Sequence, residues 1–208
     1  MGVGKLGTIF LLLFALYTIL VISGVFNFSD QQITITVQNY LNKSLDTPLS
    51  LLSLIGSVEV TAILMIFVLS VLKFKKGIVT ITMFGLGMVV ELIGKFLIFH
   101  PDPPNKFFRY DLNIFLPSGL VRTGYSYPSG HSFRTAFLVL IISYLIFTSK
   151  SLTKLQKKIF ITLSFVILFL MLISRVSLGE HWTTDVIGGS LLGFCFALFS
   201  IRAFELKP

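Results

Sequence analysis

The sequence predicts an all-α, polytopic membrane protein with six transmembrane helices and an interfacial helix after the first span. Of its 208 residues, 54% are hydrophobic and only 12% are charged, and the mean hydropathy is +0.90. So few polar side chains cannot cover a water-soluble globule. Uncharged runs also recur near the roughly 20-residue length that a bilayer core requires. These observations exclude a soluble enzyme, a disordered tail and a nucleic-acid binder.

The expected spans occupy most of the chain and form one domain over residues 1–208. They lie at about 6–26, 52–72, 77–99, 130–148, 158–176 and 183–202. The first is expected to be a retained span rather than a signal peptide, because it is long and lacks a small-x-small cleavage site. The fourth to sixth spans are the least secure in length, and the uncharged centres of the fifth and sixth, 159–174 and 186–201, are short. Either of these two could instead be a hairpin that reaches one interface only shallowly.

The segment 27–51 is more polar than the spans around it. Its apolar residues Ile33, Val37, Tyr40 and Leu41 follow a helical spacing. This pattern favours an amphipathic helix at the membrane interface. A plain tether between two spans and a helix that guides lipid toward a site remain open as alternatives.

The net charge of +8 arises from short connections on one side of the predicted membrane domain. That side holds ten of the 17 basic residues but only one of the nine acidic residues, Glu205. The ten are Lys5, Lys73, Lys75, Lys76, Lys150, Lys154, Lys157, Lys158, Arg202 and Lys207. Basic residues mark cytoplasmic loops. We therefore expect cytoplasmic termini, with the loops 27–51, 100–129 and 177–182 on the extracytoplasmic face.

Polar residues that suit phosphate chemistry gather on this outer face. Ionisable groups at membrane depth cost about 2.5–3.5 kcal/mol on insertion scales, so they need a reason. Lys95 ends the third span, and the segment 127–131, Tyr-Pro-Ser-Gly-His, opens the fourth. Unpaired amides at a helix N-terminus bind anions, and His131 can move a proton near neutral pH. Taken alone, the segment is more typical of a capped helix with an interfacial histidine.

A second constellation lies between the fifth and sixth spans. His181 and Asp185 are four residues apart, which places them on one face of a helix. A carboxylate that holds one imidazole nitrogen makes the other nitrogen a better nucleophile. Arg175 offers a planar fork for two phosphate oxygens. An interfacial ion pair beside Trp182 is the alternative interpretation.

Together these residues resemble the type-2 phosphatidic acid phosphatase superfamily of integral membrane lipid phosphatases, which is related to vanadium haloperoxidases. The family pattern proline-serine-glycine-histidine matches residues 128–131, and its serine-arginine, histidine and aspartate pattern matches Ser174, Arg175, His181 and Asp185. The resemblance covers roughly residues 50–202. It implies that His181 forms a phosphohistidine, that Asp185 orients it, and that His131 protonates the leaving oxygen. It also implies a set of groups that hold the phosphoryl oxygens, namely Lys95, Ser129, the Gly130 amide and Arg175, and it requires no metal or cofactor.

The first part of the family pattern is incomplete. Lys95 and Pro103 match it, but Asp102 stands where the family has an arginine. A carboxylate facing phosphate would repel it, so we expect Asp102 to point away and another cation to substitute. Arg109, Arg122 and Arg134 are candidates. Arg134 is favoured because it follows His131 by three residues, although it could instead snorkel to the interface.

The sequence thus predicts a metal-independent, extracytoplasmic-facing hydrolase of lipid phosphates or diphosphates in the cell membrane. The substrate could be undecaprenyl diphosphate, which is slightly favoured, phosphatidylglycerophosphate, phosphatidate or a lipid A phosphate. A catalytically weak lipid-phosphate binding or transport protein and a lipid-to-lipid phosphotransferase remain alternatives. A zinc site built from His100, Asp102, His131, Glu180 and His181 is a weaker one. Protein partners, oligomeric state and the roles of Glu59, Glu91 and Cys195 are left open.

Overall fold

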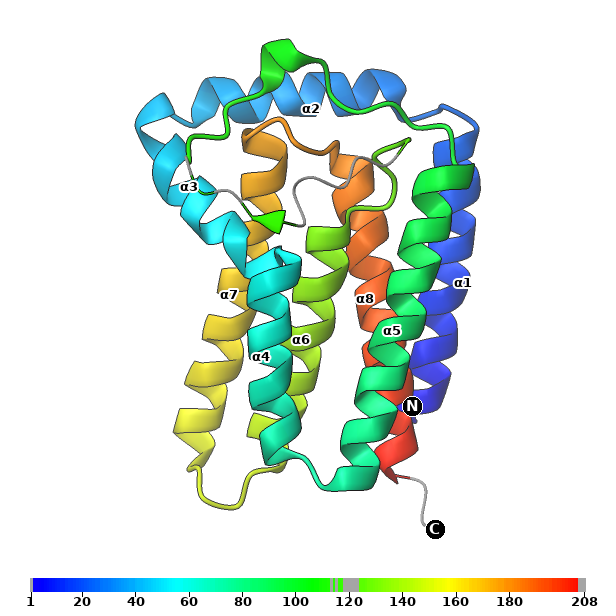
Figure 1. The fold of residues 1–208 in the computed structure, drawn as a ribbon, viewed down its shortest axis with the longest axis vertical. Coiled ribbons are helices and arrows are strands. Elements are labelled where there is room, and N and C mark those ends of the chain that lie inside the picture. Colours follow the sequence, from blue (N-terminus) through cyan, green and yellow to red (C-terminus); the bar gives the residue numbers. More distant parts are fainter. Residues whose placement is uncertain (1, 113, 115, 118–123, 206–208) are drawn as a thin grey trace.

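The computed structural model has an all-α architecture, and it describes residues 2–112, 114, 116–117 and 124–205. The helices are α1 (Val3–Ile22), α2 (Asn27–Tyr40), α3 (Asp46–Ser53), α4 (Val58–Val71), α5 (Phe74–Leu97), α6 (Gly130–Thr148), α7 (Lys154–Ser177) and α8 (Thr183–Glu205). Three short 3₁₀ turns, Lys43–Leu45, Leu54–Gly56 and Asn105–Phe107, connect them. α1, α4, α5, α6, α7 and α8 stand roughly upright, and α2 lies across one end of the bundle (Figure 1).

The predicted spans are largely confirmed, with one correction. Among the described residues, α1, α5, α6, α7 and α8 are each long and apolar enough to cross a membrane. The span predicted at 52–72 is wrong as a continuous helix, because the pair Lys43–Gly56 and Val58–Val71 bends by 52° at Ser57. The Ser57 side chain accepts a hydrogen bond from the Val60 amide and so starts a new helix there. The bent pair makes a sixth span if it is counted as one.

The fifth and sixth spans, which the sequence allowed to be shallow hairpins, are full-length helices. α7 has 24 residues and α8 has 23, so neither is a shallow hairpin. α7 begins with a capping box, in which Thr153 and Gln156 each accept a hydrogen bond from the backbone amide of the other. The cap allows the helix to start within the lysine-rich loop, before the apolar run begins.

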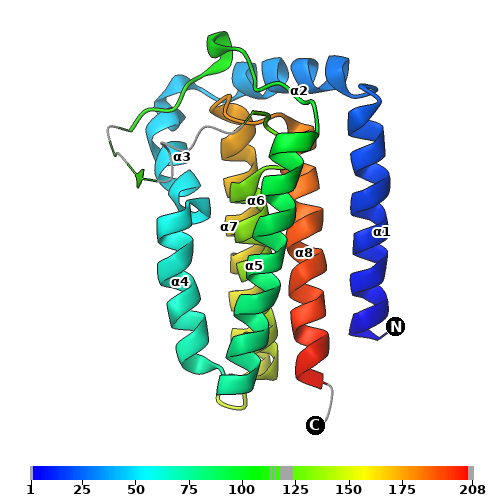
Figure 2. The ribbon, with the colours of Figure 1, turned by 45° about the vertical axis from the view of Figure 1, so that its right-hand side comes forward.

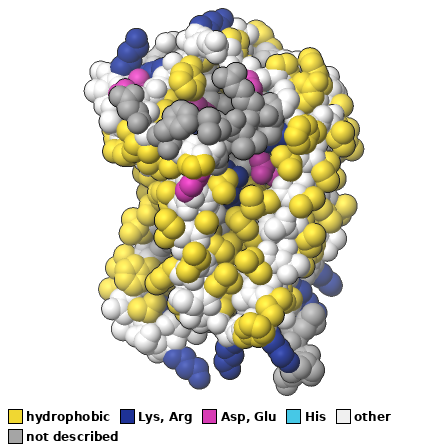
Figure 3. All heavy atoms as spheres, viewed as in Figure 1, with side chains coloured by type: hydrophobic (Ala, Val, Ile, Leu, Met, Phe, Trp, Pro, Cys, Tyr) yellow, Lys and Arg dark blue, Asp and Glu magenta, His cyan; other side chains and the backbone are white. Residues whose placement is uncertain are grey.

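α6 and α8 form the centre of the bundle. In each, 61% of the span is buried, against 11% in α1 and 22% in α5. Phe137 and Ile141 of α6 pack against Met65 and Val68 of α4 and Ala197 of α8. Apolar side chains also cover much of the outer surface, as a membrane protein requires (Figure 3).

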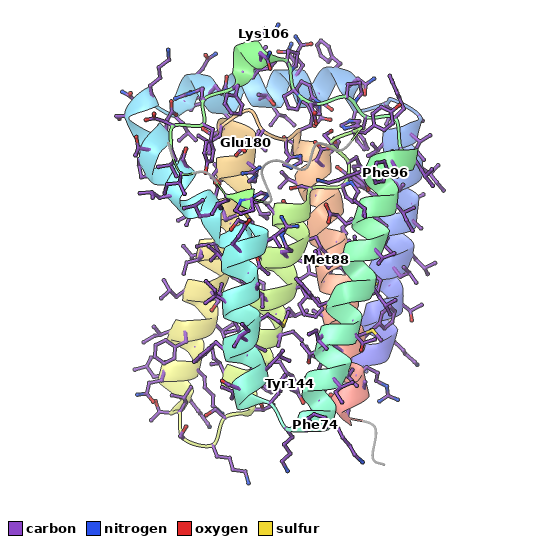
Figure 4. All side chains as sticks on the ribbon, in the orientation of Figure 1. Phe74, Met88, Phe96, Lys106, Tyr144 and Glu180 are labelled. Atoms are coloured by element: carbon purple, nitrogen blue, oxygen red, sulfur yellow. The ribbon has the colours of Figure 1, made fainter. Side chains whose placement is uncertain are left out.

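The two ends of the bundle differ in character. The α4–α5 and α6–α7 connections lie at the end opposite α2, where Lys and Arg side chains project (Figure 3). Tyr144 and Phe74 mark this end, whereas Glu180 and Lys106 lie at the α2 end (Figure 4). The segment predicted as an interfacial helix is a helix across the bundle end, as both views show (Figure 2). Its Asp30 and Thr34 are buried against the bundle.

Candidate active site

The residues predicted to carry chemistry converge at the α2 end of the bundle. The start of α6, the end of α5 and the connection from α7 to α8 meet there (Figure 1). The Ser129 amide donates to the Asp185 carbonyl at 3.0 Å, which joins the start of α6 directly to α8. Gly189 allows this approach, because a Cβ there would lie 2.2 Å from the Ser129 carbonyl oxygen. Helix packing therefore fixes one half of the site against the other.

His181 and Asp185 are paired as the sequence predicted. The His181 Nδ1 atom lies 3.3 Å from Asp185 Oδ2, and the Trp182 amide donates to the same oxygen at 2.9 Å. Burial, together with the charges of Arg175 and Lys95, lowers the pKa of His181 to about 4 despite the opposing effect of Asp185. The imidazole is therefore neutral at physiological pH. With Nδ1–H directed at the carboxylate, Nε2 carries the free lone pair that a nucleophile needs.

His131 lies in the first turn of α6, close enough to His181, Arg175, Arg134 and Lys95 to feel their charges. Its backbone packs against the turn before α4, where a Cβ on Gly56 would lie 2.8 Å from His131 Cβ. His131 of α6 and His181, from the connection between α7 and α8, are thus brought to one place. This is the arrangement that a nucleophile and a separate proton donor require.

Arg175 lies in the last turn of α7 and is 3% exposed. Its Nη1 donates to Glu180 Oε2 in a close ion pair. Burial raises the pKa of Glu180, although the charge of Arg175 opposes the shift. From the sequence, Glu180 is expected only as a possible zinc ligand. In the structure it is the counter-charge that holds the guanidinium at the site.

A second carboxylate, Glu91, serves the other two cations. Lys95 Nζ lies 3.2 Å from Glu91 Oε1, and Arg134 Nη1 lies 3.9 Å from Glu91 Oε2. Arg134 also donates through Nε to the Gly56 carbonyl at 2.7 Å. The arginine favoured as the substitute cation is therefore buried beside the start of α6 and does not snorkel to the interface. Glu91, left without a role by the sequence, joins the two cations.

Ser129 and Gly130 begin α6. The Ser129 hydroxyl caps the helix and accepts from the Ser132 amide at 3.4 Å. Gly130 has no room for a side chain, because a Cβ would lie 2.5 Å from Glu91 Oε1 and 2.8 Å from Arg134 Nη1. The absent side chain allows those charged groups to reach the helix N-terminus, where the first amides lack partners within the helix.

The other candidate cations fall outside the cluster or outside the described residues. Arg109 binds Asp46 through Nε at 3.0 Å and Nη2 at 2.7 Å, and it donates to the carbonyls of Gln38 and Leu41. Arg109 therefore ties α2 and α3 to the loop after α5. Arg122 lies outside the described residues. Asp102 lines a cavity with His100, Asp30 and Trp182 on the side of α2.

Two residues that contact Asp185 or its neighbour Thr184 were not predicted from the sequence. His100 Nδ1 lies 2.9 Å from Asp185 Oδ1, and Asp30 accepts from the Thr184 amide and hydroxyl. The sequence placed His100 only in a weak zinc hypothesis. Within the part of the chain that the structure describes, no group of three or more histidine, cysteine, aspartate or glutamate side chains is arranged to hold a metal. The available signal was an acidic residue, Asp30, in the predicted amphipathic helix. Its partner Thr184 is 154 residues away in the chain.

Comparison with known proteins decides the family. A family model described as the PAP2 superfamily matches residues 76–207. The chain belongs to the PAP2 superfamily. Phosphatidylglycerophosphatase B of Bacillus subtilis (strain 168) is 36% identical over 85 residues, 41% of each chain. Undecaprenyl-diphosphatase of Sulfolobus acidocaldarius is 30% identical over 154 residues, 73% of this chain and 65% of that protein. The chain thus spans less than two thirds of either relative's length.

Two solved structures share the fold. A transmembrane PAP2 type phosphatidylglycerolphosphate phosphatase from Bacillus subtilis superposes with a TM-score of 0.75 at 22% identity, over 96% of this chain and 95% of that one. Aquifex aeolicus LpxE superposes with a TM-score of 0.60 at 23% identity, over 83% and 94%. The predicted family and the all-α membrane architecture are confirmed for this PAP2 chain, a multi-pass membrane protein.

Proposed function

We propose that this PAP2 chain is a lipid phosphate or diphosphate phosphatase that works through a phosphohistidine on His181. The observation that carries the proposal is the meeting of His181, Asp185 and His131 with buried cations at one end of an apolar helical bundle. The names of the curated relatives, a phosphatidylglycerophosphatase and an undecaprenyl-diphosphatase, support lipid phosphates as the substrate class.

In the first step, His181 Nε2 attacks the phosphorus atom and the bond from phosphorus to the leaving oxygen breaks. Asp185 stabilises the positive charge that develops on the ring through Nδ1–H. His131 gives its proton to the leaving oxygen, so the leaving group departs as a lipid alcohol or as a singly protonated lipid monophosphate. Lys95, Arg175, Arg134 and the amides at Ser129 and Gly130 are the groups proposed to hold the phosphoryl oxygens.

In the second step, water attacks the phosphohistidine and His131 takes the proton that the water loses. The bond from Nε2 to phosphorus breaks, inorganic phosphate leaves, and His181 returns to its neutral form. Removing one donor that stabilises the developing charge typically costs about 10²–10³-fold in rate. The steps require no metal ion, because the buried cations supply the positive charge.

We propose that the site faces the extracytoplasmic side and that both termini are cytoplasmic. The lysine-rich connections lie at the end of the bundle opposite the site, which supports this orientation. The substrate tail would enter from the bilayer while the headgroup reaches the α2 end. An undecaprenyl diphosphate-type substrate is slightly favoured, and reporter fusions at the C-terminus and in the loop at 100–112 would test the orientation.

Phosphate release from a panel of lipid phosphates, measured in detergent with a chelator present, tests the function. We expect release by the wild type and none by a His181→Ala variant. Release equal in the two proteins would refute the proposed nucleophile. Binding of a lipid phosphate without turnover would instead identify a binding or transport protein. Transfer of the phosphoryl group to a second lipid, without free phosphate, would identify a phosphotransferase.

A further inference from the structure

The Asp185 carboxylate contacts two imidazoles, those of His181 and His100, and the proposed mechanism uses only His181. Its Oδ2 atom faces His181 Nδ1 and the Trp182 amide. Its Oδ1 atom is fully buried, has no aligned hydrogen bond among the described residues, and lies 2.9 Å from His100 Nδ1. His100 itself is 4% exposed and comes from the loop after α5. A buried carboxylate oxygen in this position needs a positive charge beside it.

The partners of the His100 ring show that both nitrogens face acceptors. Nδ1 lies 3.1 Å from the Ser126 hydroxyl oxygen, and that hydroxyl gives its own proton to the His100 carbonyl at 2.9 Å. Ser126 must therefore accept from Nδ1–H. On the other side, Nε2 lies 3.5 Å from the Thr184 hydroxyl oxygen and 3.8 Å from Asp30 Oδ2.

Thr184 cannot donate to that second nitrogen. Its single hydroxyl proton goes to Asp30 Oδ2 at 2.5 Å, and its amide goes to Asp30 Oδ1 at 3.0 Å. A neutral His100 with a lone pair on Nε2 would face only oxygen atoms that are also acceptors. A proton on Nε2 removes this conflict, so the geometry favours the imidazolium.

The charged groups around His100 act in the same direction. Burial alone lowers the pKa of His100, but the contact with Asp185 and the charges of Asp185, Asp30 and Asp102 outweigh it and raise that pKa above its ordinary value. These carboxylates come from α8, α2 and the loop after α5. The charge of Lys95, at the end of α5, acts on Asp102 and lowers the pKa of that carboxyl, against the raising effects of burial and Asp185. The Tyr127 ring packs edge-on against the imidazole, with centroids 6.2 Å apart.

We propose that His100 is a positioning residue that sits as an imidazolium between Asp30 and Asp185 and keeps Asp185 ionised and aimed at His181. Without this cation, two buried carboxylates would lie near each other, and protonation would relieve their repulsion. A protonated Asp185 no longer stabilises the charge that develops on His181. A cavity of about 270 Å³, lined by His100, Asp30, Asp102 and Trp182, gives His100 a route for proton exchange away from Asp185.

The charge on His100 can be measured without any activity. The chain has three histidines, so ¹⁵N-histidine NMR of the detergent-solubilised protein resolves few ring signals. At pH 7 we expect an imidazolium signal from His100 that is absent from a His100→Gln variant. Three neutral imidazoles in the wild type would overturn the proposal. This measurement does not depend on the proposed function.

The kinetic consequence rests on the proposed phosphatase activity. His100→Gln keeps a donor toward Asp185 but removes the charge, so the acid limb of the kcat/KM profile should move to higher pH by about one unit or more. Adding Asp30→Asn removes the second carboxylate and should return the limb part of the way. A merely structural role for His100 would lower activity at all pH values without moving the limb.

Asp111→Asn is the matched control, because Asp111 is a carboxylate at the same end whose partner is the exposed Thr47 hydroxyl. This variant should keep the wild-type profile. If His100→Gln does not fold, Asp30→Asn alone tests the proposal. Without the Asp30 carboxylate, His100 should lose its proton at lower pH, and the alkaline limb should move to lower pH. An acid limb that does not move in His100→Gln overturns the proposal. Where only Asp30→Asn folds, an alkaline limb that does not move in that variant overturns it. A double variant whose acid limb lies at the same pH as that of His100→Gln also overturns the proposal. A wild-type protein that releases no phosphate would instead refute the proposed function.

Discussion

The close contact between α6 and α8 makes Gly189→Ala the most informative single substitution. The added Cβ would lie 2.2 Å from the Ser129 carbonyl oxygen and 3.0 Å from Ser132 Cβ. Ordinary contact begins near 3.4 Å, so the start of α6 must move away from α8 by about 1 Å. That movement stretches the bond from the Ser129 amide to the Asp185 carbonyl and shifts His131 away from His181. A displacement of about 1 Å at reacting groups typically costs about 10²-fold in rate.

We therefore expect Gly189→Ala to lower kcat about 10²-fold and to destabilise the protein by about 1–3 kcal/mol through overpacking. Phosphate release and thermal unfolding of the purified proteins measure the two effects. Gly85→Ala on α5 is the matched control, because a Cβ there meets no atom within 4 Å. It should keep wild-type kcat and gain up to about 1 kcal/mol from helix propensity. Wild-type kcat in a folded Gly189→Ala variant would refute this account of how the two halves are held.

Three further predictions concern the cluster itself. Asp185→Asn should lower kcat by about 10³–10⁴-fold with little change in KM, because the ring charge loses its partner; steady-state kinetics would contradict this if KM alone changed. Arg134→Ala should lower kcat/KM about 10²-fold if this guanidinium replaces the missing arginine, and near wild-type turnover would refute that role. Because burial lowers the pKa of His181 to about 4, its ring should stay neutral as the pH falls and gain a proton only near that value. A ¹⁵N-histidine titration of the His181 ring would contradict this if protonation occurred near pH 6.5.

The sequence predicted the membrane helices well because hydropathy reports how long an apolar run is. It could not report a bend, so the run at 52–72 gave no sign that Ser57 interrupts it. For α7 and α8 the uncharged run underestimated the helix, because Lys154 and Asp185 lie within the first turn of each helix. Charged residues at a helix end shorten the apolar run without shortening the helix.

The site was predictable where its residues are close together in the chain or form a known pattern, as with His181 and Asp185. Its supporting carboxylates were not. Glu91 reaches both Lys95, one turn away, and Arg134, which belongs to another helix. His100 meets Asp185, which lies 85 residues further along the chain. Such contacts depend on how helices pack, which spacing along the chain does not encode.

The central claim is that the ring of His181 forms a bond to phosphorus. Rapid alkaline quenching during turnover, followed by mass spectrometry of the peptides, tests this directly, because phosphohistidine survives base. We predict a phosphoryl group on the His181 peptide when the wild type is quenched during turnover. Turnover with no phosphoryl group on His181, or with the group on another residue, would contradict the account.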